Sequence, residues 1–336
     1  YNILQGVNLN AVDFGTAFLP EYQDPTLAPS STAGASAVTG DQMRAIRGYS
    51  SINQTASWMW RTYHSVQFSF QRRFTHGLSF GFNDTIGIYD HQNLAPRLDH
   101  RPDGSFVVRA DQQAAEDLLG NNNPQTHIMK ANFVWDLPDY RGEGPLARTV
   151  GLIVSDWQLA GIWTAATGGA YSVGFSYQNG GSNVNLTGSP DYGARVRIVG
   201  DPGDGCSDDV HRQFNTAAFQ GALPGSVGLE SGNNYLRGCF SSVLDLSIAR
   251  NIEIGGGRAV QLRVDLFNAP NQAGITGRNT TLNLSSPSDP VTAQNLPFDD
   301  AGNLVDSRSR PRGAGFGVAN AYQSPRTVQA QIRFSF

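Results

Sequence analysis

The side chains that could do chemistry are few in this chain, and the densest group of them is acidic. The Gly-rich segment 201–209 carries four aspartates, Asp201, Asp204, Asp208 and Asp209. Calcium prefers oxygen ligands on loops of this kind, but the Asp-x-Asp-x-Asp-Gly spacing of a calcium-binding loop is missing. The segment 298–303 is a weaker example of the same pattern. We therefore expect a solvated acidic loop in both places, with calcium as the alternative.

No pattern of a catalytic, metal or cofactor site stands out. The six histidines, at positions 64, 76, 91, 100, 127 and 211, form no His-x-x-x-His pair, and there is no Cys-x-x-Cys, so zinc is not expected. The chain has neither a Gly-x-Ser-x-Gly elbow nor a phosphate-binding loop. His64 and Ser65 are adjacent, but successive residues of a strand point to opposite faces. We expect no catalytic residue, metal, cofactor or enzymatic activity.

Cys206 and Cys239 are the two cysteines of the chain. In an oxidising compartment they would form one disulfide that closes a loop of about thirty residues and contributes roughly 3–4 kcal/mol. The alternative is two free thiols.

The composition excludes several classes of protein. The 336 residues include 24 basic and 28 acidic ones, a net charge of −4, so there is no basic surface for nucleic acid. No apolar run approaches the ~18 residues of a transmembrane helix. The start, Tyr1-Asn-Ile-Leu, lacks Met and the features of a signal peptide, so we expect that the chain begins inside a longer precursor.

The elements that must position these groups are strands, and the clearest is the last one, residues 326–336. Its residues alternate strictly between an apolar and a polar face, which is the two-residue period of a strand. The pattern reaches the final residue, as expected where a last strand must pair to close a barrel wall. The apolar face consists of Val328, Ala330, Ile332, Phe334 and Phe336.

The same alternation recurs along the chain. Strands are expected from residues 58, 78, 127, 157, 244 and 260 onward, with a stub at 1–9 and a short helix within 110–120. The strand from residue 157 is expected to continue to Phe175 past a bulge at Gly168 and Gly169. The connections are short at 75–77 and 255–257, intermediate at 138–154, and long at 10–57, 91–125, 177–241 and 270–325.

Short turns at one end and long loops at the other are typical of outer-membrane barrels. The polar face, which would line a wet interior, carries Asp245, Glu253, Arg263 and Asp265. We therefore predict an all-β fold, a transmembrane antiparallel β-barrel wall of about eight strands with long extracellular loops. Aromatic side chains near strand ends would anchor it at the bilayer interface; they are Trp58, Trp60, Tyr63, Trp135, Trp157, Trp163 and Tyr171.

Several segments, in order, resemble the Oar-like TonB-dependent outer-membrane receptors, whose N-terminal part is similar to a carboxypeptidase regulatory domain. The resemblance covers about residues 58–336. Its segments are Tyr63–Phe82, Asn132–Pro138, Asp156–Trp163, Phe214–Phe219, Leu236–Gly238, Leu244–Asn251, Asp265–Asn268, Phe316–Gly317 and Arg326–Phe336.

The resemblance implies that the chain is the C-terminal part of a 22-stranded barrel. The plug domain of such a receptor would not be part of this chain. Its function would be uptake or binding of a bulky nutrient. The implied partners are outer-membrane lipid, upstream barrel strands and a plug of the same precursor or another chain, and the TonB complex through an N-terminal part. Ile332, Phe334 and Phe336 would be the signal for the barrel-assembly machinery, although Gln331 replaces the small residue that such strands tend to carry.

Three other interpretations remain open at this stage. The chain could belong to a structural or adhesive outer-membrane protein that binds a partner and transports nothing. It could form a passive porin-like channel, or it could be a soluble β-sandwich or lectin.

Overall fold

The computed structural model describes residues 2–140, 144, 151 and 154–336, and its main feature is one antiparallel sheet of eight strands. The strands follow each other in the order β1-β2-β3-β6-β7-β13-β14-β19. They are β1 (Asn2–Asn8), β2 (Asn53–Thr75), β3 (Leu78–Gln92), β6 (His127–Asp136), β7 (Trp157–Ala166), β13 (Ser241–Gly255), β14 (Arg258–Phe267) and β19 (Thr327–Ser335).

The register places the predicted apolar residues on one continuous face of this sheet. Phe80 lies opposite Phe133, which lies opposite Gly161, and Gly161 lies opposite Leu246. The same row continues through Leu266 to Val328. Side chains one residue along each strand point the other way, which gives the sheet a separate polar face. We call these two surfaces the apolar face and the polar face.

Tight hairpin turns lie at one end of the sheet. His76 and Gly77 join β2 to β3, and both have positive φ values, 53° and 77°, as a two-residue type I′ turn requires. Gly256 and Gly257 join β13 to β14 in the same way, with φ values of 64° and 77°. The connection expected at 138–154 runs from β6 to β7 at this end, but most of its residues lie outside the described ranges. Both predicted hairpins are confirmed.

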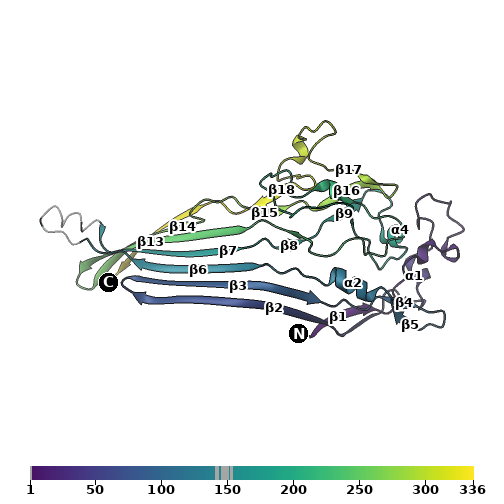
Figure 1. Ribbon diagram of the computed structural model, residues 1–336, viewed down its shortest axis with the longest axis horizontal. Helices are drawn as coiled ribbons and strands as arrows, with labels where there is room; N and C mark the ends of the chain where they lie inside the picture. The colour runs from purple at the N-terminus through teal and green to yellow at the C-terminus, as the bar shows by residue number, and fades with distance from the viewer. Residues whose placement is uncertain (1, 141–143, 145–150, 152–153) are drawn as a thin grey trace.

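The four long connections, residues 9–52, 93–126, 167–240 and 268–326, lie together at the opposite end (Figure 1). We call them the cap. Its strands are β4 (Leu98–His100), β5 (Phe106–Val108), β8 (Ala170–Tyr171), β9 (Gly174–Tyr177), β10 (Arg197–Ile198), β11 (Phe219–Gln220), β12 (Leu236–Arg237), β15 (Ile275–Arg278), β16 (Thr281–Ser286), β17 (Asp289–Ala293) and β18 (Ala319–Tyr322). Its helices are α1 (Gly40–Met43), α2 (Gln112–Leu119) and α4 (Asn183–Thr187), with 3-10 turns η1 (Thr16–Phe18), η2 (Pro20–Tyr22), η3 (Thr216–Ala218) and η4 (Asp306–Arg308).

The structure corrects three boundaries. The loop predicted at 10–57 ends at residue 52, because β1 pairs with β2 from Asn53 onward and satisfies the backbone of a polar stretch. The loops predicted at 91–125, 177–241 and 270–325 contain short strands and helices; among these, α2 is the predicted helix. The strand from Trp157 ends at Ala166 and does not continue to Phe175.

Gly168 explains why that strand ends. A Cβ at Gly168 would overlap the carbonyl group of Gly238, so the two backbones are in direct contact. The chain leaves the main sheet there, and β8 pairs with β12 while β9 pairs in parallel with β16.

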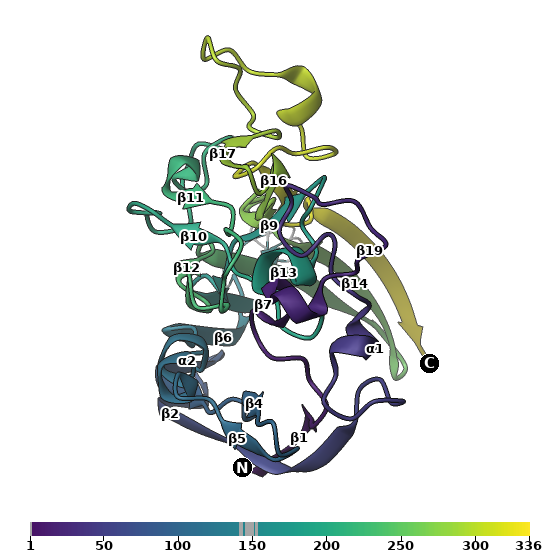
Figure 2. The ribbon, with the colours of Figure 1, turned by 90° about the vertical axis from the view of Figure 1, so that its right-hand side faces the viewer.

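The sheet is open. β1 pairs with β2 alone and β19 with β14 alone among the described strands, so each has one free edge. Seen from the cap end, the sheet curves and its two edge strands lie apart (Figure 2). Within the described ranges, no helix is both long enough and apolar enough to cross a bilayer.

Candidate functional site

The cap has a hydrophobic core of its own, built from segments far apart in the sequence. Phe214 packs against Phe316 and Phe219, with ring centroids 5.1 and 5.6 Å apart. Phe316 is fully buried, as are Leu236 and Leu284. Burying such side chains stabilises a fold by about 1.5–3 kcal/mol each. The last two long connections therefore form one packed unit at the end of the sheet.

The first long connection is fastened to this unit by a buried ion pair. Arg44 Nη1 lies 2.9 Å from Asp191 Oδ2, and Nη2 donates to Oδ1 at 3.2 Å. Their side chains are 7% and 14% exposed, so removing Arg44 would leave the charge of Asp191 unpaired and away from water. Arg44 also donates to the Asn10 carbonyl at 2.5 Å. The pair thus fixes residues 9–52 to residues 167–240.

Phe14 brings three of the long connections together. Its ring stacks on Tyr192, with centroids 4.5 Å apart and planes at 8°. The guanidinium groups of Arg109 and Arg97 lie 4.5 and 4.8 Å from the same ring centre. Such cation–π contacts strengthen when water is excluded, and Arg97 is largely buried. Phe14, Tyr192 and the two arginines form what we call the Phe14 clamp.

His100 adds a titratable group beside the Phe14 clamp. Its Nδ1 lies 2.8 Å from Asp13 Oδ1 and its Nε2 lies 2.9 Å from the Leu9 carbonyl oxygen. Both neighbours are acceptors, so the doubly protonated ring fits best. Burial lowers the pKa of His100, but the Leu9 carbonyl and the carboxylates of Asp13 and Asp99 outweigh it, and the pKa lies above its usual value.

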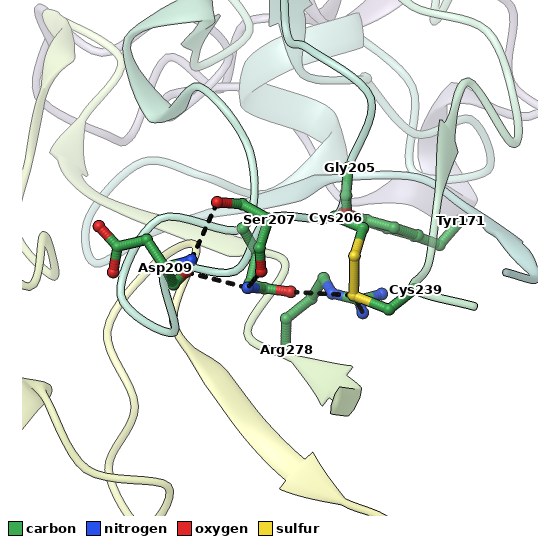
Figure 3. The surroundings of a disulfide bond; sticks show 8 residues. Tyr171, Gly205, Cys206, Ser207, Asp209, Cys239 and Arg278 are labelled. Carbon is green, nitrogen blue, oxygen red and sulfur yellow. Dashed lines mark hydrogen bonds between the residues drawn. A yellow bond between two sulfur atoms is a disulfide. The ribbon is translucent and has the colours of Figure 1, made fainter. Parts of the chain in front are cut away.

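The structure joins Cys206 and Cys239 by a disulfide across 33 residues of sequence (Figure 3). Gln213 lies beside it and is 1% exposed. Its Nε2 donates to the carbonyls of Ser207 and Asp209 at 2.7 and 3.0 Å. The disulfide and Gln213 together hold the acidic loop 201–209 against the core of the cap.

Three carboxylates of the two acidic loops accept hydrogen bonds from backbone amides nearby in sequence. Asp201 accepts from the Gly203 amide and Asp209 from the His211 amide, each at 2.9 Å. Asp299 accepts from the amides of Asn303 and Ala301, and the bonds from Asn303, with a smaller contribution from Ala301, lower the pKa of Asp299. Among the described residues, no three acidic, His or Cys side chains converge as metal ligands.

The polar face of the sheet carries a hollow of about 350 Å³. Asp245, Arg263 and Asp265, three of the four charged residues predicted for this face, line it together, and Arg263 Nε donates to Asp265 Oδ1 at 2.9 Å. Glu253 lies nearer the hairpin end and lines a different hollow. The walls of the first hollow also include Val134, Ile162 and Phe267, which the predicted polar face did not include.

The expected interface aromatics divide into two groups. The register puts Tyr63 opposite Asp90, on the polar face, and Tyr171 lies in β8 of the cap. The prediction therefore misplaced both residues. Side chains one residue apart in a strand point to opposite faces, which puts Tyr63 on the polar face, and the strand from Trp157 ends before it reaches Tyr171. The tryptophans lie in the strands of the sheet, at positions 58, 60, 135, 157 and 163.

The last strand, β19, carries the residues predicted as an assembly signal. Ile332 lies opposite Leu262 and Phe334 opposite Val260, so both belong to the apolar face. They are 63% and 68% exposed, and Phe336 follows the end of the strand and is fully exposed.

Sequence reasoning missed the Phe14 clamp, the Arg44–Asp191 pair, Gln213 and Arg278. All lie in the long connections, where no sustained period marks which side chains meet, and Arg278 ends the short strand β15. The one signal available was that Phe14, Phe214 and Phe316 are large apolar residues inside polar segments.

The comparisons with known proteins agree with this architecture. A family model described as an outer membrane beta barrel domain matches residues 1–329. No curated protein matches the chain, and no solved structure does. The family match excludes the soluble alternative. The chain belongs to the outer membrane beta barrel domain family and is a protein of the bacterial outer membrane.

Proposed function

We propose that this chain forms wall and external loops of a TonB-dependent receptor that takes up or binds a bulky nutrient. The observation that carries the proposal is the folded cap at one end of a wall whose other end has tight turns. The segments that resemble the Oar-like receptors occur in the order that they have in that family. A large cap with its own core offers a binding surface that a simple pore does not need.

The free edges of β1 and β19 support a larger barrel. Unpaired strand edges expose N–H and C=O groups that cannot be left unsatisfied in lipid. We infer that further strands, from the same precursor or another chain, continue the wall on both sides. A plug and a TonB-contacting segment would then belong to the same precursor.

The coding sequence upstream of Tyr1 tests the proposal most directly. We expect a plug domain preceded by a TonB box. A precursor without them would refute energised transport, and a steady ion conductance of the full-length protein in a planar bilayer would then favour a passive channel. If both results were negative, the structural or adhesive role would remain.

We also propose that Phe334 and Phe336 help the barrel-assembly machinery to recognise β19. Replacing both by Ala should lower the amount of folded protein in the outer membrane without changing its expression. A matched Gln329→Ala variant on the polar face should assemble normally. Equal assembly of all three proteins would refute the role.

A further inference from the structure

We propose that the cap contains a binding site for small carboxylates, formed where Arg278 meets the Cys206–Cys239 disulfide and a cavity at the end of β7. This site is independent of transport, because it is built within the cap and requires neither a plug nor further strands.

Two contacts hold the guanidinium of Arg278 in place. It lies 4.8 Å from the centre of the Tyr171 ring, and its Nη2 lies 3.8 Å from Cys239 Sγ. Figure 3 shows Arg278 beside the disulfide. Burial raises the pKa of Tyr171 to about 12 despite the opposing charge of Arg278, and its hydroxyl donates to the Gly205 carbonyl at 2.6 Å. Tyr171 is therefore neutral and does not balance the charge of Arg278.

No carboxylate of the described residues lies within ion-pair distance of Arg278. Its Nε is buried and has no hydrogen-bond partner there. A partly buried guanidinium without an anion is unfavourable, because desolvation is not offset by a charge-assisted hydrogen bond. An anionic ligand would supply the negative charge and the hydrogen-bond acceptor that Arg278 lacks among the described residues.

The cavity beside Arg278 has room for such a ligand, at about 340 Å³. This lies at the lower end of the ~300–1,000 Å³ typical of small-molecule pockets. The side chains of Ser241 and Thr276 add hydroxyl groups to the lining, and Ala170 and Ile275 add apolar surface. The contact of Gly168 with Gly238 closes one wall with backbone alone.

The charge of the site favours a carboxylate over a phosphate. Arg278 is the one cationic side chain in the described lining, and a single planar guanidinium matches a monoanionic carboxylate in a bidentate manner. The neighbouring Arg237 lies outside the lining and donates to Asn123 Oδ1. Ala170 and Ile275, the apolar part of the lining, suit a short aliphatic chain attached to the carboxylate.

Calorimetric titration of the full-length protein in detergent micelles tests the site, with butyrate as the probe. We expect saturable binding of butyrate and none of its uncharged amide, butyramide. Arg278→Gln should weaken butyrate binding by about tenfold or more, as expected for the loss of a hydrogen bond between charged groups. Arg237→Gln is the matched control, since it removes an arginine of the same cap outside the cavity, and it should bind like the native protein.

A second variant tests the cavity without changing the charge. A Cβ at Gly169 meets no atom within 4 Å, so Gly169→Leu should fold, fill the cavity and abolish butyrate binding. This variant keeps the proposal testable if Arg278→Gln fails to fold. No saturable butyrate binding by the native protein would overturn the proposal, as would unchanged binding by Gly169→Leu. Equal loss in Arg237→Gln, or tighter binding of inorganic phosphate than of butyrate, would also overturn it.

Discussion

Gly161 is a position of close packing on the apolar face, and it gives a sharp test of that face. The residue lies in β7 between Phe133 of β6 and Leu246 of β13. The Phe133 ring covers the glycine. A Cβ there would overlap Phe133 Cε1 and would lie 2.8 Å from its Cζ and 3.0 Å from Leu246 Cδ2. Two of the three contacts are with an aromatic ring, which must move as a whole.

We predict that Gly161→Val destabilises the barrel by about 2 kcal/mol, within the 1–3 kcal/mol typical of overpacking. Valine favours strands, so the backbone would offset part of this cost. Urea titration of the full-length protein in lipid vesicles, followed by tryptophan fluorescence, measures the free energy of unfolding.

Gly6→Val is the matched control, because Gly6 also lies in a strand of the sheet and a Cβ there meets nothing within 4 Å. Its free energy of unfolding should change by no more than about 0.5 kcal/mol. A Gly161→Val protein as stable as the native one would refute the packing of Phe133 over Gly161. An equal loss in both variants would show that any glycine replacement in these strands is costly.

Three further predictions concern the cap. Cys206→Ser opens a loop of 33 residues and should destabilise the cap by about 4 kcal/mol on the loop-entropy model, seen as faster proteolysis near residues 201–239 while the sheet stays folded. The pKa of His100 is raised in the folded state, so the stabilisation that protonated His100 contributes is complete below the unfolded pKa of about 6.5 and is lost as the pH rises through the folded pKa. Hydrogen exchange at residues 9–13 should therefore increase over that pH range, and His100→Gln should abolish this dependence on the protonation of His100. Arg44→Gln leaves Asp191 buried and unpaired and should cost about 3 kcal/mol, measured as protease cleavage within 9–52; a rate equal to that of the native protein would contradict the ion pair.

The wall could be predicted from the sequence because one rule governs it. Each strand alternates between two environments, so the period alone places Val328 and Phe80 on the same face. The predicted order of seven strands and a stub matches the sheet of the structure, although the size of the complete barrel stays a prediction.

The cap could not be predicted in this way. Phe214 and Phe316 meet although about a hundred residues, including the strands β13 and β14, separate them in the sequence, and neither lies in a periodic segment. Their segments are rich in Gly, Asn and Ser because tight turns need those residues, and the same composition is typical of an unstructured loop. Gly168 ends a strand through a contact with Gly238, which local sequence does not reveal.

The arrangement of the two faces of the sheet is the central claim, and adjacent residues of β19 test it. Ala330 and Gln331 lie on opposite faces, opposite Val264 and Arg263 of β14. Each is replaced by Cys in turn, labelled with a fluorophore in the full-length protein, and inserted into vesicles that contain brominated lipid. We predict that lipid quenches the label at position 330 and that a water-soluble quencher reaches the label at position 331. Equal quenching of both labels by the water-soluble reagent, with none by lipid, would contradict the membrane wall.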